Sequence, residues 1–194
     1  MSITLVAIML NEQDVVDRWI AGFRRIPDVF DEVVVVDGGS SDRTVELLKS
    51  ASIRVEQRPF PNDFADQRNF ANDLTFTHWV FEMDADEVPS VPLLCGLQEI
   101  CRGADKSGVD CVGIPRLNFH DGRLVTSPGY RGLDFQYRLH RRHCRWAGKV
   151  HEELTGHAPR IELDIRDGHF IQHLKTSARH VERNAVYARM GGTQ

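Results

Sequence analysis

The first hundred residues alternate between short apolar runs and stretches of helical periodicity. Continuous apolar runs, such as residues 3–10 and 32–36, are typical of strands that are buried on both faces. Between these two runs, apolar side chains recur at helical spacing from Val15 to Phe23. This order indicates an α/β fold, with right-handed crossovers and a mostly parallel central sheet flanked by helices. The expected strands are residues 3–10, 32–36, 53–57 and 77–83, and the expected helices are residues 15–23, 43–50, 64–74 and 91–101.

After residue 100 the pattern changes to short strands joined by loops rich in glycine and aspartate. We expect strands at residues 111–115, 135–140 and 161–165, followed by a helix over residues 176–190. A length of 194 residues suits one domain with a sizeable hydrophobic core. The sequence therefore predicts a single domain over residues 1–194, with two halves that are built differently.

Composition and charge limit the classes of protein that fit this chain. Hydrophobic residues make up 41% and charged residues 27%, which is near the average for folded globular domains. A net charge of −4 argues against a nucleic-acid-binding domain. One dense basic stretch, residues 138–145, has two open interpretations: contact with phosphate groups, or a solvated loop.

The cysteines and the N-terminal residues bear on the compartment. Four cysteines contain no Cys-x-x-Cys pair and match no zinc module. We interpret them as reduced thiols of a cytoplasmic protein. The N-terminal apolar run is only about eight residues long and no basic residues precede it, so we predict no signal peptide. No stretch approaches the roughly 18 apolar residues of a membrane helix, so we predict no transmembrane segment.

The strongest local feature is Asp84-Ala85-Asp86-Glu87, which directly follows an expected strand. Residues two apart on an extended chain point to the same side, so Asp84 and Asp86 would repel each other unless a cation or protons neutralised them. A divalent cation with oxygen ligands would remove this repulsion and would also bind a diphosphate. The alternative is an acidic loop without a ligand, in which Glu87 begins a helix.

A second feature, Asp37-Gly38-Gly39-Ser40-Ser41-Asp42-Arg43-Thr44, follows the strand at residues 32–36. The two glycines permit close backbone approach, and the Asp37 carboxylate can accept hydrogen bonds from a nucleobase N–H or a ribose hydroxyl. The lysine of nucleotide-hydrolase phosphate loops is absent. An ordinary junction of strand, turn and helix is the competing interpretation.

Together these features resemble the family 2 glycosyltransferases of the GT-A fold. In that family the first strand ends in Asn-Glu, here Asn11-Glu12, and the second ends in Asp-Gly-x-Ser-x-Asp-x-Thr, here residues 37–44. A helix carries Arg-Asn, here Arg68-Asn69, and a later strand ends in Asp-x-Asp, here residues 84–86. Some branches add Trp-x-Gly-x-Val-His-Glu, here residues 146–152. The resemblance covers residues 3–175.

The resemblance implies an inverting, metal-assisted transfer of a sugar from a nucleotide-diphosphate sugar to an acceptor hydroxyl, with UDP as the expected carrier. Residues 1–100 would bind the nucleotide sugar, residues 101–175 would bind the acceptor, and residues 176–194 would form a C-terminal helix. The acceptor stays open between a glycan, a lipid-linked group, a protein side chain and a modified nucleobase.

The resemblance also implies the residues that bind the donor. Asp84 and Asp86 would hold Mn²⁺ or Mg²⁺. His173 is the expected third ligand if a histidine binds the metal, and an ordinary hydrogen-bonded role is the alternative. Arg68 would contact the phosphates or support the acidic loop, or else it would pair at the surface with an aspartate of its own helix. The implied nucleotide-binding residues are Leu10, Asn11, Glu12, Asp37, Arg68 and Asp84.

For the acceptor half, the resemblance implies contacts from Trp146 and His151. Trp146 would stack on a sugar ring or pack beneath the acceptor loop. An inverting transfer needs a general base for the acceptor hydroxyl, and Glu152 is the expected base. Its neighbour Glu153 is the alternative, and on a strand it would point the other way.

Two other classes compete with this interpretation. A nucleotidyltransferase that makes sugar nucleotides shares the alternating sheet, but such enzymes begin with a glycine-rich phosphate loop where this chain has residues 11–14 (NEQD). The other class is a non-catalytic nucleotide-binding module. A degraded enzyme would be expected to lose an acidic ligand, yet both Asp84 and Asp86 are present.

Overall fold

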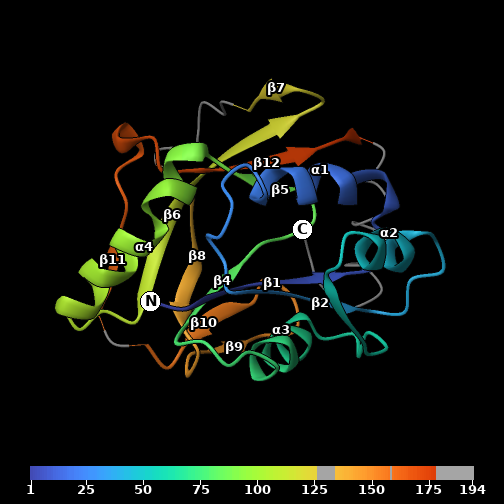
Figure 1. The fold of residues 1–194 in the computed structure, drawn as a ribbon, viewed down its shortest axis with the longest axis horizontal. Coiled ribbons are helices and arrows are strands. Elements are labelled where there is room, and N and C mark those ends of the chain that lie inside the picture. Colours follow the sequence, from blue (N-terminus) through green and yellow to red (C-terminus); the bar gives the residue numbers. More distant parts are fainter. Residues whose placement is uncertain (126–133, 158, 178–194) are drawn as a thin grey trace.

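The computed structural model describes residues 1–125, 134–157 and 159–177. The described helices are α1 (Gln13–Phe23), α2 (Thr44–Ser50), α3 (Phe64–Asp73) and α4 (Val91–Lys106), with a 3₁₀ helix at Ile165–Asp167. The described strands are β1 (Ile3–Met9), β2 (Glu32–Asp37), β3 (Arg54–Gln57), β4 (Trp79–Glu82), β5 (Glu87–Pro89), β6 (Cys111–His120), β7 (Arg123–Leu124), β8 (Asp134–Arg141), β9 (Arg145–Ala147), β10 (Glu153–Thr155), β11 (Arg160–Glu162) and β12 (Ile171–Lys175). They form the predicted α/β architecture, with helices on both sides of a central sheet (Figure 1).

The first half of the chain forms a parallel sheet with the strand order β3-β2-β1-β4. The chain moves outward from β1 to β2 and β3, and then crosses back to β4 on the other side of β1. Because parallel crossovers are right-handed, this reversal places α3 on the opposite face of the sheet from α1 and α2. Open α/β sheets bind ligands at the carboxyl ends of the strands where the order reverses, which is here between β1 and β4.

Successive side chains of β1 pack into two different cores, one on each face of the sheet. Leu5 and Ala7 belong to the larger core, which includes the buried faces of α1, α2 and α4. Val6 lies on the opposite face, where it packs with Val80 of β4 and Ala71 of α3. Burial on both faces explains why the sequence of β1 is continuously apolar and does not alternate.

The second half extends the same sheet. β8 pairs with β4 in antiparallel orientation and β6 pairs with β8, so the order continues as β4-β8-β6-β12-β5. β11 and β7 also pair with β6, while β9 and β10 form a separate two-stranded sheet next to α3. Antiparallel pairing places β8 beside β4 and β12 beside β5, the two strands between which the acidic motif lies in the sequence.

Three predicted boundaries are wrong. β6 runs to His120 instead of ending at residue 115. α4 runs to Lys106 instead of ending at residue 101, because Ala104 continues its buried face. The strand expected at residues 161–165 is only Arg160–Glu162, and the 3₁₀ helix begins three residues later.

Short strands account for most of the remaining differences. β5, β7, β9, β10 and β12 are not predicted from the sequence, because each has only two to five residues and no clear apolar alternation. Glu87 therefore lies in β5, not at the start of a helix. The helix expected at residues 176–190 falls almost entirely outside the described residues. Within the described ranges, no helix combines the length and apolar character needed to cross a membrane.

Candidate active site

A cleft of about 530 Å³ opens at the carboxyl ends of β1 and β4. It brings together most of the predicted site residues, although Asn11 and Asp37 are not among the residues that line it. Its apolar wall is formed by Ile8, Met9, Leu10, Phe60 and Phe64. Its polar lining includes Glu12, Arg68, Asp84, Asp86, Arg116, Arg138, Trp146, His151, Glu152, His173 and Lys175.

The loops after β1 and β2 hold each other in place through polar side chains. The backbone N–H of Asn11 donates to Ser40 Oγ at 2.8 Å, and Asn11 Oδ1 accepts from the backbone N–H of Ser41 at 2.9 Å. The backbone N–H of Glu12 donates to Thr44 Oγ1 at 2.7 Å. The hydroxyl groups of Ser40 and Thr44 therefore position the loop after β1, which borders the cleft.

Asp37 ends β2 and is fully buried. Its Oδ2 accepts hydrogen bonds from the backbone N–H groups of Gly39 at 3.1 Å and Ser40 at 3.0 Å. Its Oδ1 is buried and has no hydrogen-bond partner among the described residues. A buried acceptor without a donor is unfavourable, so this oxygen is suited to accept a hydrogen from a ligand beside Gly38, which lines the cleft.

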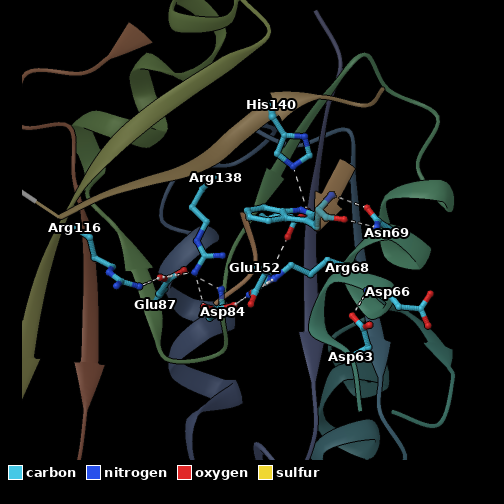
Figure 2. Close-up of polar contacts among 12 residues, drawn as sticks. Asp63, Asp66, Arg68, Asn69, Asp84, Glu87, Arg116, Arg138, His140 and Glu152 are labelled. Carbon is cyan, nitrogen blue, oxygen red and sulfur yellow. Dashed lines mark hydrogen bonds and ion pairs between the residues drawn. The ribbon is translucent and has the colours of Figure 1, made fainter. Parts of the chain in front are cut away.

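Three arginines and three carboxylates alternate beside the cleft, and all of them except Glu87 line it. We call this arrangement the arginine–carboxylate ladder (Figure 2). Charges removed from water are tolerated only with close partners, and each member of the ladder has at least one. The ladder runs from Arg116 through Glu87, Arg138, Asp84 and Arg68 to Glu152, with nitrogen–oxygen distances of 3.3, 3.0, 2.5, 2.7 and 2.7 Å between successive members.

Arg68 connects the ladder to the core and is only 4% exposed. Besides the ladder partners Asp84 and Glu152, it donates from Nη1 to Glu82 at 3.0 Å. Burial by itself would lower the pKa of the guanidinium, but the charges of these three carboxylates outweigh it and raise the pKa well above its usual value. The alternative of a surface arginine is wrong, because the aspartates of α3 pair with arginines outside that helix.

Glu82 is a buried carboxylate of β4 that sequence analysis does not single out. It is 1% exposed and accepts hydrogen bonds from Arg68, His140 Nε2 (3.2 Å) and Trp146 Nε1 (2.5 Å). Burial would raise the pKa of this carboxyl, but the bond from His140, the charge of Arg68 and the bond from Trp146 hold the pKa below its usual value. The sequence signal that could have pointed to Glu82 is that it is the one charged residue in the apolar run at residues 79–83 (WVFEM).

Asp84 and Asp86 both line the cleft, but their surroundings differ. Asp84 accepts from Arg68 at Oδ1 and from Arg138 at Oδ2, so two guanidinium groups fix its orientation. Asp86 is 3% exposed and lies beside His173, with 3.4 Å between Asp86 Oδ2 and His173 Nε2. Both carboxylates thus lie at one cleft, where arginines bind Asp84 and His173 lies beside Asp86, and their sharing of one cation stays a prediction.

The pair Asp86 and His173 has the chemistry of two ligands to one cation. Asn118 Oδ1 lies 2.9 Å from His173 Nδ1, and with that oxygen as acceptor Nδ1 carries the hydrogen. Nε2 then presents a lone pair toward the Asp86 carboxylate, which is favourable only with a cation or a proton between them. The described residues contain no group of three or more His, Cys, Asp or Glu side chains arranged to hold a metal ion.

The segment after β9 carries the remaining predicted residues. Glu152 is 14% exposed and faces the cleft through its bond to Arg68, whereas Glu153 is exposed and does not line the cleft. His151 lines the cleft and has a positive φ of 57°, an uncommon conformation for a residue with a side chain. Trp146 is 8% exposed, so it packs mainly beneath this segment and contributes a small area to the cleft wall.

Three arginines of the basic stretch at residues 138–145 are paired within the chain. Arg138 is buried in the ladder, and Arg141 pairs with Asp105. Arg145 pairs with an aspartate of α3 at 2.9 Å. These arginines are bound by carboxylates of the same chain, so the stretch is not a free cationic surface.

The reversed parallel sheet, its antiparallel continuation and the charged cleft at the reversal point define a transferase fold of the GT-A type. The sequence model described as Glycosyl transferase family 2 matches residues 4–172, and the chain belongs to that family. The family membership decides against the nucleotidyltransferase alternative.

Two curated relatives illustrate the similarity at the sequence level. The SPbeta prophage-derived glycosyltransferase SunS of Bacillus subtilis is 27% identical over 154 residues, which are 78% of this chain and 34% of SunS. An uncharacterized glycosyltransferase of Rickettsia typhi is 34% identical over 85 residues, which are 44% of this chain and 28% of that protein. The chain thus spans about a third of the length of these relatives.

Solved structures of S. aureus TarS share the fold. TarS 1–349 in complex with UDP has a TM-score of 0.65 and 16% identity, over 98% of this chain and 65% of that chain. TarS 1–349 in complex with UDP-GlcNAc has a TM-score of 0.53 and 20% identity, over 68% of this chain and 39% of that chain.

Proposed function

We propose that this chain transfers a sugar from a UDP-sugar to an acceptor hydroxyl, with inversion at the anomeric carbon. The observation that supports this proposal is the cleft at the carboxyl ends of β1 and β4, which combines an apolar wall, buried arginines and acidic side chains. TarS, a protein of the same fold, is described in complexes with UDP and UDP-GlcNAc, and for this reason UDP is the carrier to test first.

In this proposal the nucleobase lies against the apolar wall near Leu10 and Phe60. The free Oδ1 of Asp37 accepts a hydrogen from the base or the ribose, and Glu12 lies at the edge of the same pocket. The diphosphate points toward Arg68, whose guanidinium is suited to contacts with phosphate oxygens. Asn11 acts indirectly, because its side chain holds the loop after β2.

Asp86 and His173 are the residues that would hold Mn²⁺ or Mg²⁺, with Asp84 beside them. When bound, the ion would stabilise the negative charge that develops on the departing diphosphate. Arg68 and Arg138 keep the Asp84 carboxylate in one orientation, so that this group is placed before the donor arrives.

The acceptor oxygen forms a bond to the anomeric carbon from the side opposite the diphosphate. The bond between the anomeric carbon and the diphosphate oxygen breaks, and nucleoside diphosphate leaves with that electron pair. Glu152 takes the proton of the acceptor hydroxyl, because a carboxylate in the cleft can act as general base at this position. Arg68 holds Glu152 at 2.7 Å, and His151 and Trp146 border the space for the acceptor.

The first experiment is calorimetry with UDP in the presence and absence of Mn²⁺, followed by a screen of sugar nucleotides for hydrolysis. We expect UDP to bind more tightly with the metal, and one sugar nucleotide to be hydrolysed faster than the others. Asp86→Ala should abolish both the metal effect and the turnover, while Asp17→Ala on the exposed face of α1 should change neither. Absence of UDP binding under both conditions would contradict the proposal and favour a non-catalytic module.

The proposal also covers the compartment and the acceptor. All four cysteines are free thiols, as is usual in a reducing compartment, and we propose the cytoplasm on that basis. The acceptor is a hydroxyl of a glycan, a lipid-linked group, a protein or a modified nucleobase. Since the arginines of residues 138–145 are paired within the chain, they give no reason to prefer an anionic acceptor.

A further inference from the structure

Glu82 stands behind the cleft and does not line it. Two of its three partners, Arg68 and Trp146, do line the cleft, and they come from α3 and β9. The third partner, His140, lies on β8. One carboxylate from β4 therefore ties together side chains of three other elements at the back of the site.

Arg68 binds three carboxylates with three different nitrogens. Nη1 donates to Glu82 at 3.0 Å, Nη2 to Asp84 at 2.7 Å, and Nε to Glu152 at 2.7 Å. A guanidinium is planar with fixed donor directions, so a partner that holds one nitrogen also fixes where the others point. Asp84 and Glu152 line the cleft, whereas Glu82 is 1% exposed and does not line it.

Trp146 is held both by its backbone and by its indole. Asn69 accepts from its backbone N–H and donates to its carbonyl oxygen, both at 2.9 Å. The indole N–H donates to Glu82 at 2.5 Å, and the Arg68 guanidinium lies over the indole ring with 5.4 Å between the guanidinium carbon and the ring centroid. The orientation of the indole in the cleft wall therefore depends on Glu82.

We propose that Glu82 is a positioning residue, which acts through Arg68 and Trp146 to keep Glu152 and the acceptor wall in place during transfer. This inference rests on the proposed function for its kinetic consequence, but its geometric part does not. Charge-assisted hydrogen bonds are stronger than neutral ones, so a carboxylate holds both donors better than an amide of the same size. Glu82→Gln removes the charge and keeps the shape.

The geometric part is tested by nuclear magnetic resonance of the tryptophan indole N–H groups, with the Trp146 signal identified by its loss in Trp146→Phe. We expect the Trp146 signal to lie far downfield and to move upfield in Glu82→Gln. The matched control is Glu32→Gln. Glu32 is the first residue of β2, far along that strand from Asp37, and its carboxylate pairs with Arg54 at 2.9 Å. A Trp146 signal that is unchanged in Glu82→Gln would overturn the proposal.

The kinetic part is tested with the sugar nucleotide that the screen identifies. We expect Glu82→Gln to lower kcat about tenfold or more and UDP affinity by less than about threefold, because Arg68 keeps its bond to Asp84 while Trp146 loses its charged partner. Glu32→Gln should leave both unchanged. A loss of stability with normal kcat would mean that Glu82 is only structural and would overturn the proposal.

Trp146→Phe keeps an aromatic side chain, although a smaller one, and removes the N–H, so it tests the same link if Glu82→Gln fails to fold. We expect Trp146→Phe to lower kcat. In the Trp146→Phe background, Glu82→Gln should lower kcat by a smaller factor than in the parent chain, because the two residues act together. If the double variant loses kcat by the full product of the two single losses, the proposed link between Glu82 and Trp146 is overturned. If the parent chain turns over no sugar nucleotide, the proposed function fails, while the indole signal still decides the role of Glu82.

Discussion

At the scale of single residues, the site is built from charges that the chain neutralises for itself. Arg138 is 4% exposed and lies between Asp84 and Glu87. Burial lowers the pKa of its guanidinium, but the two carboxylates outweigh this and raise the pKa above its usual value. Burial of each such charge is tolerated only while its partners are present, so single substitutions in the site should destabilise the fold.

Arg138→Met should strongly destabilise the fold, because it leaves the Asp84 and Glu87 carboxylates without a buried cation that both contact. We expect the free energy of unfolding to fall by about 3–5 kcal/mol, measured by urea denaturation. Arg102→Met is the matched control, since Arg102 pairs with Glu99 on the exposed side of α4 and its loss should leave the midpoint unchanged. Equal urea midpoints for the two variants would contradict the conclusion that Arg138 neutralises two buried carboxylates.

Glu152→Gln should lower turnover by about 10²–10⁴-fold with little change in UDP affinity, because it removes a proton acceptor and keeps the side-chain shape. The measurement is steady-state kinetics together with calorimetry. Glu153→Gln serves as the control, since this neighbour is exposed and does not line the cleft. If Glu153→Gln has the larger effect, the base role belongs to Glu153.

The four cysteines should differ sharply in reactivity. Burial raises the pKa of Cys101 and Cys111 to about 12 and that of Cys144 to about 11, so at pH 8 these thiols stay protonated as well as inaccessible. Cys95 is exposed on α4. We expect Ellman's reagent to titrate one thiol in the native chain and four in denaturant, and none in native Cys95→Ser. Rapid reaction of a second native thiol would show that the core opens.

At the scale of elements, α3 is the support for the acceptor segment. Asn69 pairs with both backbone groups of Trp146 in β9. One turn further along α3, the side-chain amide of Asn72 donates to the carbonyl oxygens of Arg142 and Cys144, both at 3.1 Å. A helix from the first half thus anchors a strand from the second half through side-chain amides, which replace the partners of a neighbouring strand.

Asn69→Ala should loosen β9 without unfolding the sheet. It leaves the backbone N–H and carbonyl of Trp146 without these partners, at a cost of about 1–3 kcal/mol. We expect the Trp146 amide to exchange with solvent at least about tenfold faster, as measured by hydrogen exchange. Glu99→Ala on α4 is the control and should leave that amide unchanged. Unaltered exchange in Asn69→Ala would show that other contacts hold the strand.

At the scale of the whole molecule, one sheet joins the two halves. β4 of the first half pairs with β8 of the second half, with Trp79, Val80 and Phe81 opposite Arg141, His140 and Leu139. The ladder crosses the same junction, because Arg138 on β8 binds Asp84 after β4. Neither half has a core of its own at this boundary, since Phe81 and Leu139 belong to one hydrophobic core.

The chain should therefore unfold in a single cooperative transition, as the prediction of one domain requires. Far-ultraviolet circular dichroism and tryptophan fluorescence should give the same midpoint, because Trp19 and Trp79 report on the first half and Trp146 on the second. Leu139→Ala should lower both midpoints together, by about 2–5 kcal/mol in the free energy of unfolding. Two separate midpoints would show that the halves are independent.

Most of the first half could be predicted from the sequence because its signals are local. Apolar runs and helical spacing place β1, β2, β3 and β4 and the helices between them within a few residues of their observed bounds. The motif spacing indicates the family, and the loops that carry Asp37 and Asp84 follow from the strands that precede them. The short strands β5, β7, β9, β10 and β12 escape prediction, because two to five residues give no periodicity.

The sequence by itself determined the order of strands and helices, the family and the position of the acidic motif, since each depends on neighbours along the chain. Only the tertiary structure decided which charge meets which: Arg68 meets Glu152 across 84 positions, and Glu82 meets Trp146 across 64. These pairs exist because β8 aligns beside β4 and α3 packs against β9. The physical reason is that periodicity is a property of one element, whereas an ion pair depends on the placement of two elements in space.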